Sequence, residues 1–382
     1  MKKRLLCAGI ACALLLSLTG YAAAADLQLP SPSSILMEAS TGEILYENNA
    51  HEKLRPASVT KIMTLLLVME ALDNGSIGWD DTITTSAAAA AKGGSQIYLE
   101  ENEQLPLTEM LKSVVVSSAN DCACALAEHV AGSEAAFVAR MNERAEQLGM
   151  TDTHFVNCTG LDDGPDADTH LTTAYDIALM SRELLTHSEI KQYTTIWMDT
   201  VRDGQFGLSN TNKLVRFYDG TTGLKTGYTS AAGYCLSASA ERGGMELIAV
   251  VLHCASSSDR FESAKALLNY GFSNYTLIRP NPAGEIAPIP VILGTKDFVT
   301  PVPAHDTPIL TEKALAAQVQ TQIETQPEVR APVSAGQQLG TMRITAGEQT
   351  LAEIALVTPE EIPERTWMSL FTQLLRHVCL SA

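Results

Sequence analysis

The chain has 382 residues, of which 46% are hydrophobic and 18% charged, and it contains 25 Gly and 16 Pro. This composition excludes a disordered, collagen-like or coiled-coil protein, since the apolar fraction is ordinary and neither Gly nor Pro is enriched. The formal net charge of -18 argues against nucleic acid as a partner, because phosphates would be repelled from most of the surface. The length allows two or three domains.

Residues 1–25 are typical of a secretory signal. Basic residues at 2–4 precede an apolar run over 5–18, and three alanines at 23–25 offer small residues for cleavage. A membrane-spanning helix is the alternative, but the apolar run is shorter than the about 20 residues that a bilayer requires. We therefore expect an exported, extracytoplasmic protein whose mature chain starts near Asp26.

Eight cysteines, two of them in the signal, are too sparse for a disulfide framework in a chain of this length. Cys122 and Cys124 are two residues apart in a predicted helix, so they point to different faces and cannot easily bridge. Buried thiols that act as small apolar side chains are the favoured interpretation. One disulfide among Cys158, Cys235 and Cys254 stays open.

Hydrophobic patterns predict strands at both ends of a first domain, with helices between them. A hairpin over residues 34–46 contains Thr41-Gly42, and Thr173 with Asp176 predicts a capping box at a helix start. This order indicates a mixed α/β (α+β) protein rather than a repeated βαβ series. The other predicted helices cover 58–73, 85–92, 105–117, 120–131, 134–149 and 259–270, and the later strands cover 222–227, 233–239 and 246–253.

The composition changes beyond this first domain. Residues 278–360 are rich in Pro, Thr, Val and Gly with short alternating runs, which favours a small all-β domain. A terminal helix follows, and because Arg376 and His377 interrupt it we expect it to lie in a membrane surface rather than to cross the bilayer. Docking of this helix on the protein itself is the alternative. Its apolar stripe consists of Trp367, Leu370, Phe371, Leu374, Leu375 and Val378.

Ser58 and Lys61 form the first of three chemical motifs. They are three residues apart at a predicted helix start, so the hydroxyl and the amine share one face within hydrogen-bond reach. The helix start also places the hydroxyl near free backbone N–H groups and the positive end of the helix dipole. Taken alone, this spacing is more often a solvated pair of helix residues.

Two further motifs follow along the chain. Ser118 and Asn120 lie between an apolar segment and a new helix, where such residues are also common caps. Lys225, Thr226 and Gly227 lie in a predicted strand, where the glycine would let a ligand backbone approach closely. An exposed edge strand protected by its lysine is the plain alternative. Each motif is weak alone, but the three in this order within one domain are a strong signal.

This set of motifs is typical of penicillin-binding proteins and class A β-lactamases. The flanking sequence resembles more closely the low-molecular-mass D-alanyl-D-alanine carboxypeptidases, serine peptidases of family S11. The resemblance implies a β-lactamase/transpeptidase-like domain, an antiparallel sheet flanked by helices with a helical subdomain, followed by a small all-β domain and an amphipathic helix. It covers nearly the whole mature chain and is carried by residues 36–64, 93–95, 117–128, 141–161, 221–234 and 335–355.

We accordingly expect four parts: the signal at 1–25, a catalytic domain at 26–275, a small β-rich domain at 276–360, and a membrane-anchor helix at 361–382. The resemblance implies that the enzyme removes the terminal D-alanine from peptidoglycan stem peptides, in peptidoglycan remodelling and the control of cell shape. It also implies that β-lactams act as covalent inhibitors. The expected location is the outer face of the cell membrane.

The resemblance implies a role for each motif residue. Ser58 would attack the carbonyl between two terminal D-alanines and form an acyl-enzyme. Lys61 would accept the proton, kept uncharged by burial and by the nearby cation of Lys225. Ser118 would relay a proton to the leaving amine, and Asn120 would hold the substrate amide and orient the Lys61 amine.

The strand with Lys225, Thr226 and Gly227 would pair with the extended stem peptide, and its first two side chains would attract the terminal carboxylate. Arg260 matches a later arginine of the family and would assist substrate binding. The alternative for Arg260 is a surface residue at a helix start.

The backbone N–H groups of Ser58 and Tyr228 would form the oxyanion hole. Many relatives have His in place of Tyr228, so we expect altered pH dependence or specificity and no loss of activity. No cofactor or metal is expected, and a zinc carboxypeptidase is disfavoured because the histidines lack metal-ligand spacing. The histidines considered are His129, His154, His170 and His253.

Two alternatives remain. A class A-like β-lactamase needs a carboxylate base for deacylation, and the chain has no Glu-x-x-x-Asn segment in the expected region. In addition, Ala119 stands where that family usually has Asp. A non-catalytic peptidoglycan-binding scaffold is disfavoured because all three motifs are intact.

Overall fold

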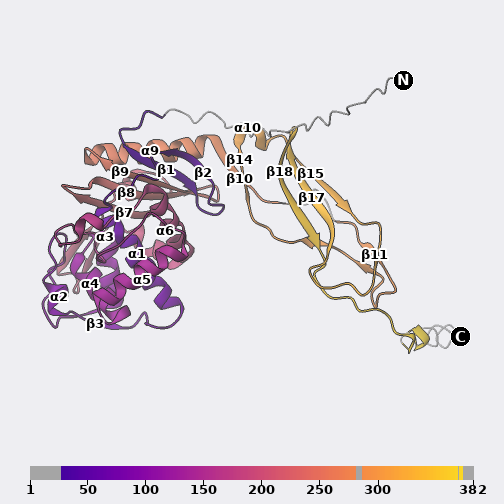
Figure 1. Cartoon of the computed structure of the whole chain (residues 1–382), viewed down its shortest axis with the longest axis horizontal. Coiled ribbons are helices and arrows are strands. Elements are labelled where there is room, and N and C mark those ends of the chain that lie inside the picture. Colours follow the sequence, from indigo (N-terminus) through magenta and orange to yellow (C-terminus); the bar gives the residue numbers. More distant parts are fainter. Residues whose placement is uncertain (1–26, 281–285, 369, 373–382) are drawn as a thin grey trace, which may run out of the picture.

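The computed structural model describes residues 27–280, 286–368 and 370–372. The predicted signal, the cleavage site and half of the predicted terminal helix (361–382) lie outside the described residues. Helices and the largest sheet form one lobe, and the later strands form a second, elongated lobe (Figure 1). The predicted fold class, a mixed α/β domain followed by a β domain, is confirmed.

The first lobe is built on a five-stranded sheet in the order β2-β1-β9-β8-β7. All neighbouring strands in it are antiparallel. The N-terminal hairpin therefore lies beside the last strand of the domain, while β7 lies at the opposite edge. The strands are β1 (Ser33–Glu38), β2 (Ile44–Asn48), β7 (Thr221–Thr229), β8 (Gly233–Arg242) and β9 (Met245–Cys254).

Both faces of this sheet are buried. Leu247 and Val251 of β9 belong to a core cluster with helix α9 (Ser257–Asn274), while Ile248 and Val250 belong to a second cluster with the remaining helices. Successive side chains of a strand point to opposite faces, so a strand covered on both sides is apolar at nearly every position. Burial of both faces therefore explains the uninterrupted apolar run from which this strand was predicted.

The helices of the first lobe follow the predicted segments, and residues 120–131 match to the residue. The principal helices are α1 (Lys61–Asp73), α3 (Leu107–Val116), α4 (Asn120–Ala131), α5 (Glu134–Gln147) and α6 (Ala174–Thr186), with short helices α2 (Ala87–Ala90), α7 (Lys191–Thr194) and α8 (Leu214–Phe217). Two small hairpins were not predicted: β3 (Thr82–Thr84) with β4 (Gln104–Pro106), and β5 (Met198–Val201) with β6 (Phe206–Ser209).

The predicted capping box at the start of α6 is only half formed. The Thr173 hydroxyl accepts a hydrogen bond from the Asp176 backbone N–H at 3.0 Å, as expected for an N-cap. The Asp176 carboxylate instead accepts hydrogen bonds from the Asp152 backbone N–H and the Thr153 hydroxyl. The carboxylate thus fastens a preceding loop to α6, which a local motif could not reveal.

In the described part of the chain, the second lobe consists mainly of strands and includes the short helix α10 (Lys313–Ala316). Its largest sheet has the order β13-β18-β17-β15. The ammonium of Lys313 donates to the Phe272 carbonyl at 2.6 Å and so joins this lobe to α9. The strands are β10 (Tyr275–Ile278), β11 (Ile289–Ile292), β12 (Phe298–Val299), β13 (Val302–Pro303), β14 (Ile309–Glu312), β15 (Val319–Thr325), β16 (Val329–Arg330), β17 (Gln338–Ala346) and β18 (Gln349–Val357).

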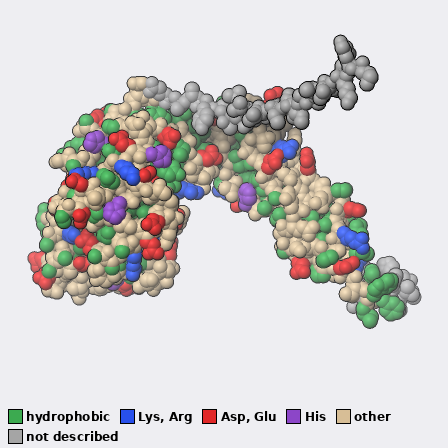
Figure 2. Space-filling view, in the orientation of Figure 1, with side chains coloured by type: hydrophobic (Ala, Val, Ile, Leu, Met, Phe, Trp, Pro, Cys, Tyr) green, Lys and Arg blue, Asp and Glu red, His purple; other side chains and the backbone are tan. Residues whose placement is uncertain are grey.

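The described end of the chain is helical at residues 367–368 and 370–372. Trp367, Met368 and Phe371 expose 89%, 73% and 58% of their surface, and apolar side chains are visible at this tip of the molecule (Figure 2). Within the described part of the chain, no helix combines the length and the apolar character needed to cross a membrane. The other residues of the predicted stripe beyond position 372 lie outside the described residues.

The five cysteines of the described chain are buried free thiols. The prediction of buried thiols is therefore confirmed for them. The disulfide left open among Cys158, Cys235 and Cys254 is not formed.

Candidate active site

Ser58 and Lys61 meet at the start of α1. Ser58 lies in a 3-10 turn, Ala57–Thr60, that continues directly into α1 with Lys61 as its first residue. The Lys61 ammonium donates to the Ser58 hydroxyl at 3.0 Å. Lys61 is fully buried, whereas Ser58 is partly exposed. The expected contact between a reachable hydroxyl and a buried amine is present.

Three neutral oxygens surround the Lys61 amine. Besides Ser58, it donates to Asn120 Oδ1 at 2.5 Å and to the Thr159 carbonyl at 2.8 Å. Asn120 Nδ2 donates to the Gly93 carbonyl at 2.7 Å, which fixes the amide with its oxygen towards the lysine. The second motif is thereby joined to the first, and among the described residues no carboxylate is a hydrogen-bond partner of the Lys61 amine.

Burial lowers the pKa of Lys61 to about 7, with Cys158 and Asp121 acting in the opposite direction. The neutral amine is therefore populated near neutral pH. The expected repulsion between Lys61 and Lys225 is seen at Lys225. Its pKa lies well below the usual value because of burial first, and then because of the nearby cations of Lys61 and Arg260.

The third motif lies against the turn that carries Ser58. A Cβ atom on Gly227 would lie 2.6 Å from the Pro56 carbonyl oxygen and 3.1 Å from the Ser58 backbone nitrogen. Only glycine permits this approach. The sequence predicted that Gly227 would let a ligand backbone approach. In the direction in which a Cβ atom would point, however, the space is filled by the protein's own backbone.

A second glycine fixes the opposite side of the same turn. Gly160 has a φ of +81°, and a Cβ on it would lie 1.9 Å from the Ala57 carbonyl oxygen. Asn157 Oδ1 accepts the Gly160 backbone N–H at 2.7 Å and holds this loop. The loop contributes the Thr159 carbonyl to Lys61, so its position decides where the amine lies.

Ser118 lies between α3 and α4 in a left-handed conformation, with φ +65°, and is almost fully buried. The preceding Val116 carbonyl accepts the Thr211 backbone N–H at 3.1 Å. Thr226 in turn donates its hydroxyl to that of Thr211 at 2.7 Å. Thr211 thus connects the Ser118 segment with the third motif, and nothing in the sequence singled it out.

Lys225, the first residue of the third motif, and Arg260 both donate to backbone carbonyls of this motif. The Lys225 ammonium donates to the Thr226 carbonyl at 2.9 Å. Arg260 is buried and donates to the Gly227 carbonyl at 3.0 Å, so it is not the surface residue considered as the alternative. Burial lowers the pKa of Arg260. The hydrogen bond to the Gly227 carbonyl indicates that Arg260 supports the backbone of β7.

Tyr228 is the exposed end of an aromatic stack. Its side chain is 53% exposed, and its ring lies on the ring of Tyr234 with centroids 4.3 Å apart. The Arg260 guanidinium lies 5.3 Å from the Tyr234 ring centroid. The side chain therefore points out of the protein while the backbone of Tyr228 continues β7 next to Gly227.

His170 lies behind the Ser58 turn and was considered only as a core or exposed histidine. Its Nδ1 accepts the Val156 backbone N–H at 3.2 Å, so we assign the proton to Nε2, which lies 2.8 Å from the Thr60 hydroxyl. Burial, aided by His154, lowers the pKa of His170 to about 4. A neutral, hydrogen-bonded core histidine is confirmed here.

A pocket of about 560 Å³ adjoins these motifs without including Ser58. Its lining includes Gly93 and Thr159, whose carbonyls hold Asn120 and Lys61. Lys92 and Glu134 form another part of its wall.

Known proteins resemble the chain over most of its length. A family model described as D-alanyl-D-alanine carboxypeptidase matches residues 20–256, and one described as penicillin-binding protein 5, C-terminal domain, matches residues 272–364. D-alanyl-D-alanine carboxypeptidase DacF of Bacillus subtilis is 40% identical over 344 residues, covering 88% of this chain and 87% of that protein.

Two solved structures are similar to this chain in fold as well as in sequence. Penicillin-binding protein 5 from Haemophilus influenzae has a TM-score of 0.77 and 30% identity, covering 88% of this chain and 98% of that one. Penicillin-binding protein D2 from Listeria monocytogenes in its ampicillin-bound form has a TM-score of 0.59 and 33% identity. That match covers 65% of this chain and 99% of the other.

Proposed function

The chain belongs to the D-alanyl-D-alanine carboxypeptidase family, and on this premise we propose that Ser58 is the nucleophile with which it removes the terminal D-alanine of peptidoglycan stem peptides. The observation that carries the proposal is the 3.0 Å contact between the Ser58 hydroxyl and the buried Lys61 amine. A neutral amine beside a serine hydroxyl is a general base in position.

In the first step, Ser58 Oγ bonds to the carbonyl carbon as its proton passes to Lys61. The ammonium so formed keeps Asn120 Oδ1 and the Thr159 carbonyl as acceptors, which stabilise its charge. The carbonyl oxygen becomes an oxyanion and is held by the backbone N–H groups of Ser58 and Tyr228. The close contact of Gly227 with the Ser58 turn supports the assignment of these two N–H groups to one oxyanion hole.

In the second step, the C–N bond breaks and D-alanine leaves. Its nitrogen takes a proton from the Ser118 hydroxyl, which is replenished from the Lys61 ammonium. Water then attacks the acyl-enzyme, and the Ser58 hydroxyl is restored. The links from Val116 through Thr211 to Thr226 support a fixed position of the Ser118 segment beside the third motif.

The substrate would bind along β7. This strand is at the end of the sheet order, so it offers a free edge with which an extended peptide can pair. Lys225 and Thr226 would attract the terminal carboxylate, and Asn120 Nδ2 keeps one N–H for the substrate amide. For Arg260 we propose support of the Gly227 carbonyl in place of direct contact with the carboxylate.

We further propose that the protein is exported by residues 1–25 and held on the outer face of the cell membrane by residues 361–382. The exposed side chains of Trp367 and Phe371 support an apolar anchor. The end of α9 at Asn274 supports a catalytic domain over 26–275, followed by the β domain over 276–360. Co-sedimentation with anionic lipid vesicles, lost on truncation after residue 360, is the expected behaviour.

The central experiment combines labelled penicillin with D-alanine release. The wild type should hold the label persistently and release D-alanine from a peptide ending in D-Ala-D-Ala. Ser58→Ala should lose both by about 10⁴-fold or more, and Lys61→Ala should behave similarly. Ser118→Ala should be impaired, whereas Ser117→Ala is its matched control, because the Ser117 hydroxyl only donates to the Ser113 carbonyl.

Three outcomes would overturn the proposal. Rapid release of the label would indicate a β-lactamase, and absence of labelling would indicate a non-catalytic peptidoglycan-binding protein. Unchanged labelling of Ser58→Ala would place the nucleophile elsewhere.

A further inference from the structure

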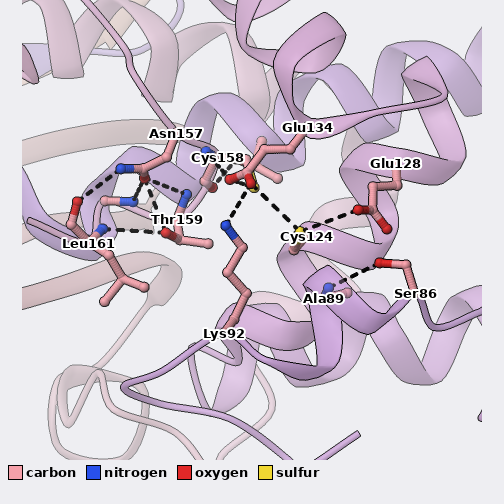
Figure 3. A network of polar contacts seen from close by, with 12 residues as sticks. Ser86, Ala89, Lys92, Cys124, Glu128, Glu134, Asn157, Cys158, Thr159 and Leu161 are labelled. Carbon is pink, nitrogen blue, oxygen red and sulfur yellow. Dashed lines mark hydrogen bonds and ion pairs between the residues drawn. The ribbon is translucent and has the colours of Figure 1, made fainter. Parts of the chain in front are cut away.

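Two buried cysteines and a glutamate converge beside the pocket of about 560 Å³. Cys124 comes from α4, Glu134 is the first residue of α5, and Cys158 lies in the loop that also carries Thr159. One ligand atom of each of the three lies within 4.8 Å of the other two. Cys158 Sγ is 3.2 Å from Glu134 Oε1, and Cys124 Sγ is 3.9 Å from Glu134 Oε2 (Figure 3).

These separations suit a tetrahedral metal ion. With Zn–S near 2.3 Å and Zn–O near 2.0 Å, a tetrahedron places a sulfur and an oxygen about 3.5 Å apart. The distance of 3.2 Å between Cys158 Sγ and Glu134 Oε1 is close to that value, and Cys124 Sγ lies 3.9 Å from the other carboxylate oxygen, Oε2. Two thiolates with one carboxylate favour a borderline-soft divalent ion over Mg²⁺ or Ca²⁺, which prefer oxygen ligands only.

Lys92 gives the cluster a balanced charge. Its ammonium donates to Glu134 Oε2 at 2.6 Å, which leaves Oε1, the oxygen facing Cys158, to bind a metal. Two thiolates, a carboxylate and a divalent cation carry one net negative charge, which the ammonium of Lys92 neutralises. A partner that holds the outer oxygen of a carboxylate ligand in this way orients the ligand and tunes the site.

The pocket provides the route of entry. Lys92 and Glu134 line it, and both side chains are partly exposed, whereas Cys124 and Cys158 are fully buried behind them. A water molecule from the pocket can supply a fourth ligand.

We propose that Cys124, Cys158 and Glu134 form a binding site for Zn²⁺ or a similarly soft divalent cation. Binding breaks two S–H bonds, forms two metal–sulfur bonds and releases two protons to solvent, so the affinity rises with pH. The site lies outside the chemistry of Ser58 and goes beyond the proposed function.

Equilibrium dialysis of the full chain against Zn²⁺, with a phosphine reductant present, tests the site directly. The wild type should bind one equivalent, and Cd²⁺ should produce a thiolate-to-metal charge-transfer absorption. Lys92→Met should weaken binding by about 10–100-fold, and Cys124→Ala, Cys158→Ala or Glu134→Gln should weaken it further. Cys122→Ala is the matched control, because Cys122 is a buried cysteine of the same helix outside the cluster.

Two additional measurements keep the result unambiguous. Ser58→Ala should bind Zn²⁺ as the wild type does, so that failure of the metal site and failure of the proposed catalysis are distinguished. Proton release measured in weakly buffered solution should approach two per metal ion for the wild type, a readout that requires no cysteine variant to fold. The proposal is overturned by absence of stoichiometric binding, by binding that survives Cys124→Ala with Cys158→Ala, or by a native disulfide between these two cysteines.

Discussion

Gly227 and Ser58 are in direct backbone contact, because a Cβ atom on Gly227 would lie 3.1 Å from the Ser58 nitrogen. The same atom would lie 2.6 Å from the Pro56 carbonyl oxygen, which cannot move without displacing the turn. The glycine therefore sets the distance between the edge strand and the proposed nucleophile. It also sets the spacing of the two N–H groups to which we assign the oxyanion.

The first prediction concerns Gly227→Ala. We expect acylation by a labelled penicillin to slow by about 10²–10³-fold, comparable with the loss of an oxyanion donor, because the added methyl separates β7 from the Ser58 turn. Gly207→Ala is the control, since a Cβ there meets no atom within 4 Å. Acylation of Gly227→Ala at the rate of the control would contradict the prediction.

The second prediction is a pH profile governed by Lys61. The pKa of this amine is about 7, and only its neutral form can accept the Ser58 proton. The second-order rate of acylation should therefore rise with pH, reach half its maximum near pH 7 and level off above it. Lys61→Arg should be inactive at every pH, because a guanidinium does not release its proton. Stopped-flow acylation across this range is the measurement, and a flat profile would exclude Lys61 as the base.

Sequence reasoning succeeded where one local pattern decides the structure. Helix α4 matches its predicted bounds because an apolar segment ends at Ser118 and Gly132 closes the helix in a left-handed conformation. The contact between Ser58 and Lys61 follows from helix geometry alone. Strand β9 was recognisable because both of its faces are buried.

The rest of the site depends on contacts between residues far apart in the chain. Lys61 meets the Thr159 carbonyl, and Thr60 meets His170, through pairings that no periodicity encodes. A backbone carbonyl is an equally good acceptor from any residue, so Thr159 carries no sequence signal. The hairpin of β3 and β4 was missed because three residues per strand are too few to establish an alternating pattern.

The third prediction concerns Tyr228→His. The Tyr228 side chain is exposed and only stacks on Tyr234, whereas the oxyanion role belongs to the backbone. We expect acylation at neutral pH to stay within about tenfold of wild type, while the pH profile of D-alanine release gains a transition near pH 6.5 from the new imidazole.

The matched control is Tyr98→His, another exposed tyrosine outside the motifs, which should introduce no such transition. Loss of acylation in Tyr228→His by a factor comparable with Gly227→Ala would show that the tyrosine side chain itself is required.

The last prediction concerns acid stability and His170. The pKa of this residue is about 4 in the folded protein, against 6.5 for an ordinary histidine, so the unfolded chain binds more protons between these values. Stability contributed by the neutral imidazole is present above pH 6.5 and is lost as the pH falls towards 4. The free energy of unfolding should decrease by about 2 kcal/mol from this residue between pH 7 and pH 5, since each pKa unit corresponds to about 1.4 kcal/mol.

Urea denaturation of wild type and His170→Gln at the two pH values measures this contribution. The variant should be less stable at pH 7, because the hydrogen bonds to Thr60 and Val156 are perturbed, but it should lose about 2 kcal/mol less on acidification. His305→Gln, an exposed histidine of the second lobe, should keep the acid sensitivity of the wild type. Equal acid sensitivity of His170→Gln and wild type would mean that the imidazole is not held neutral by the fold.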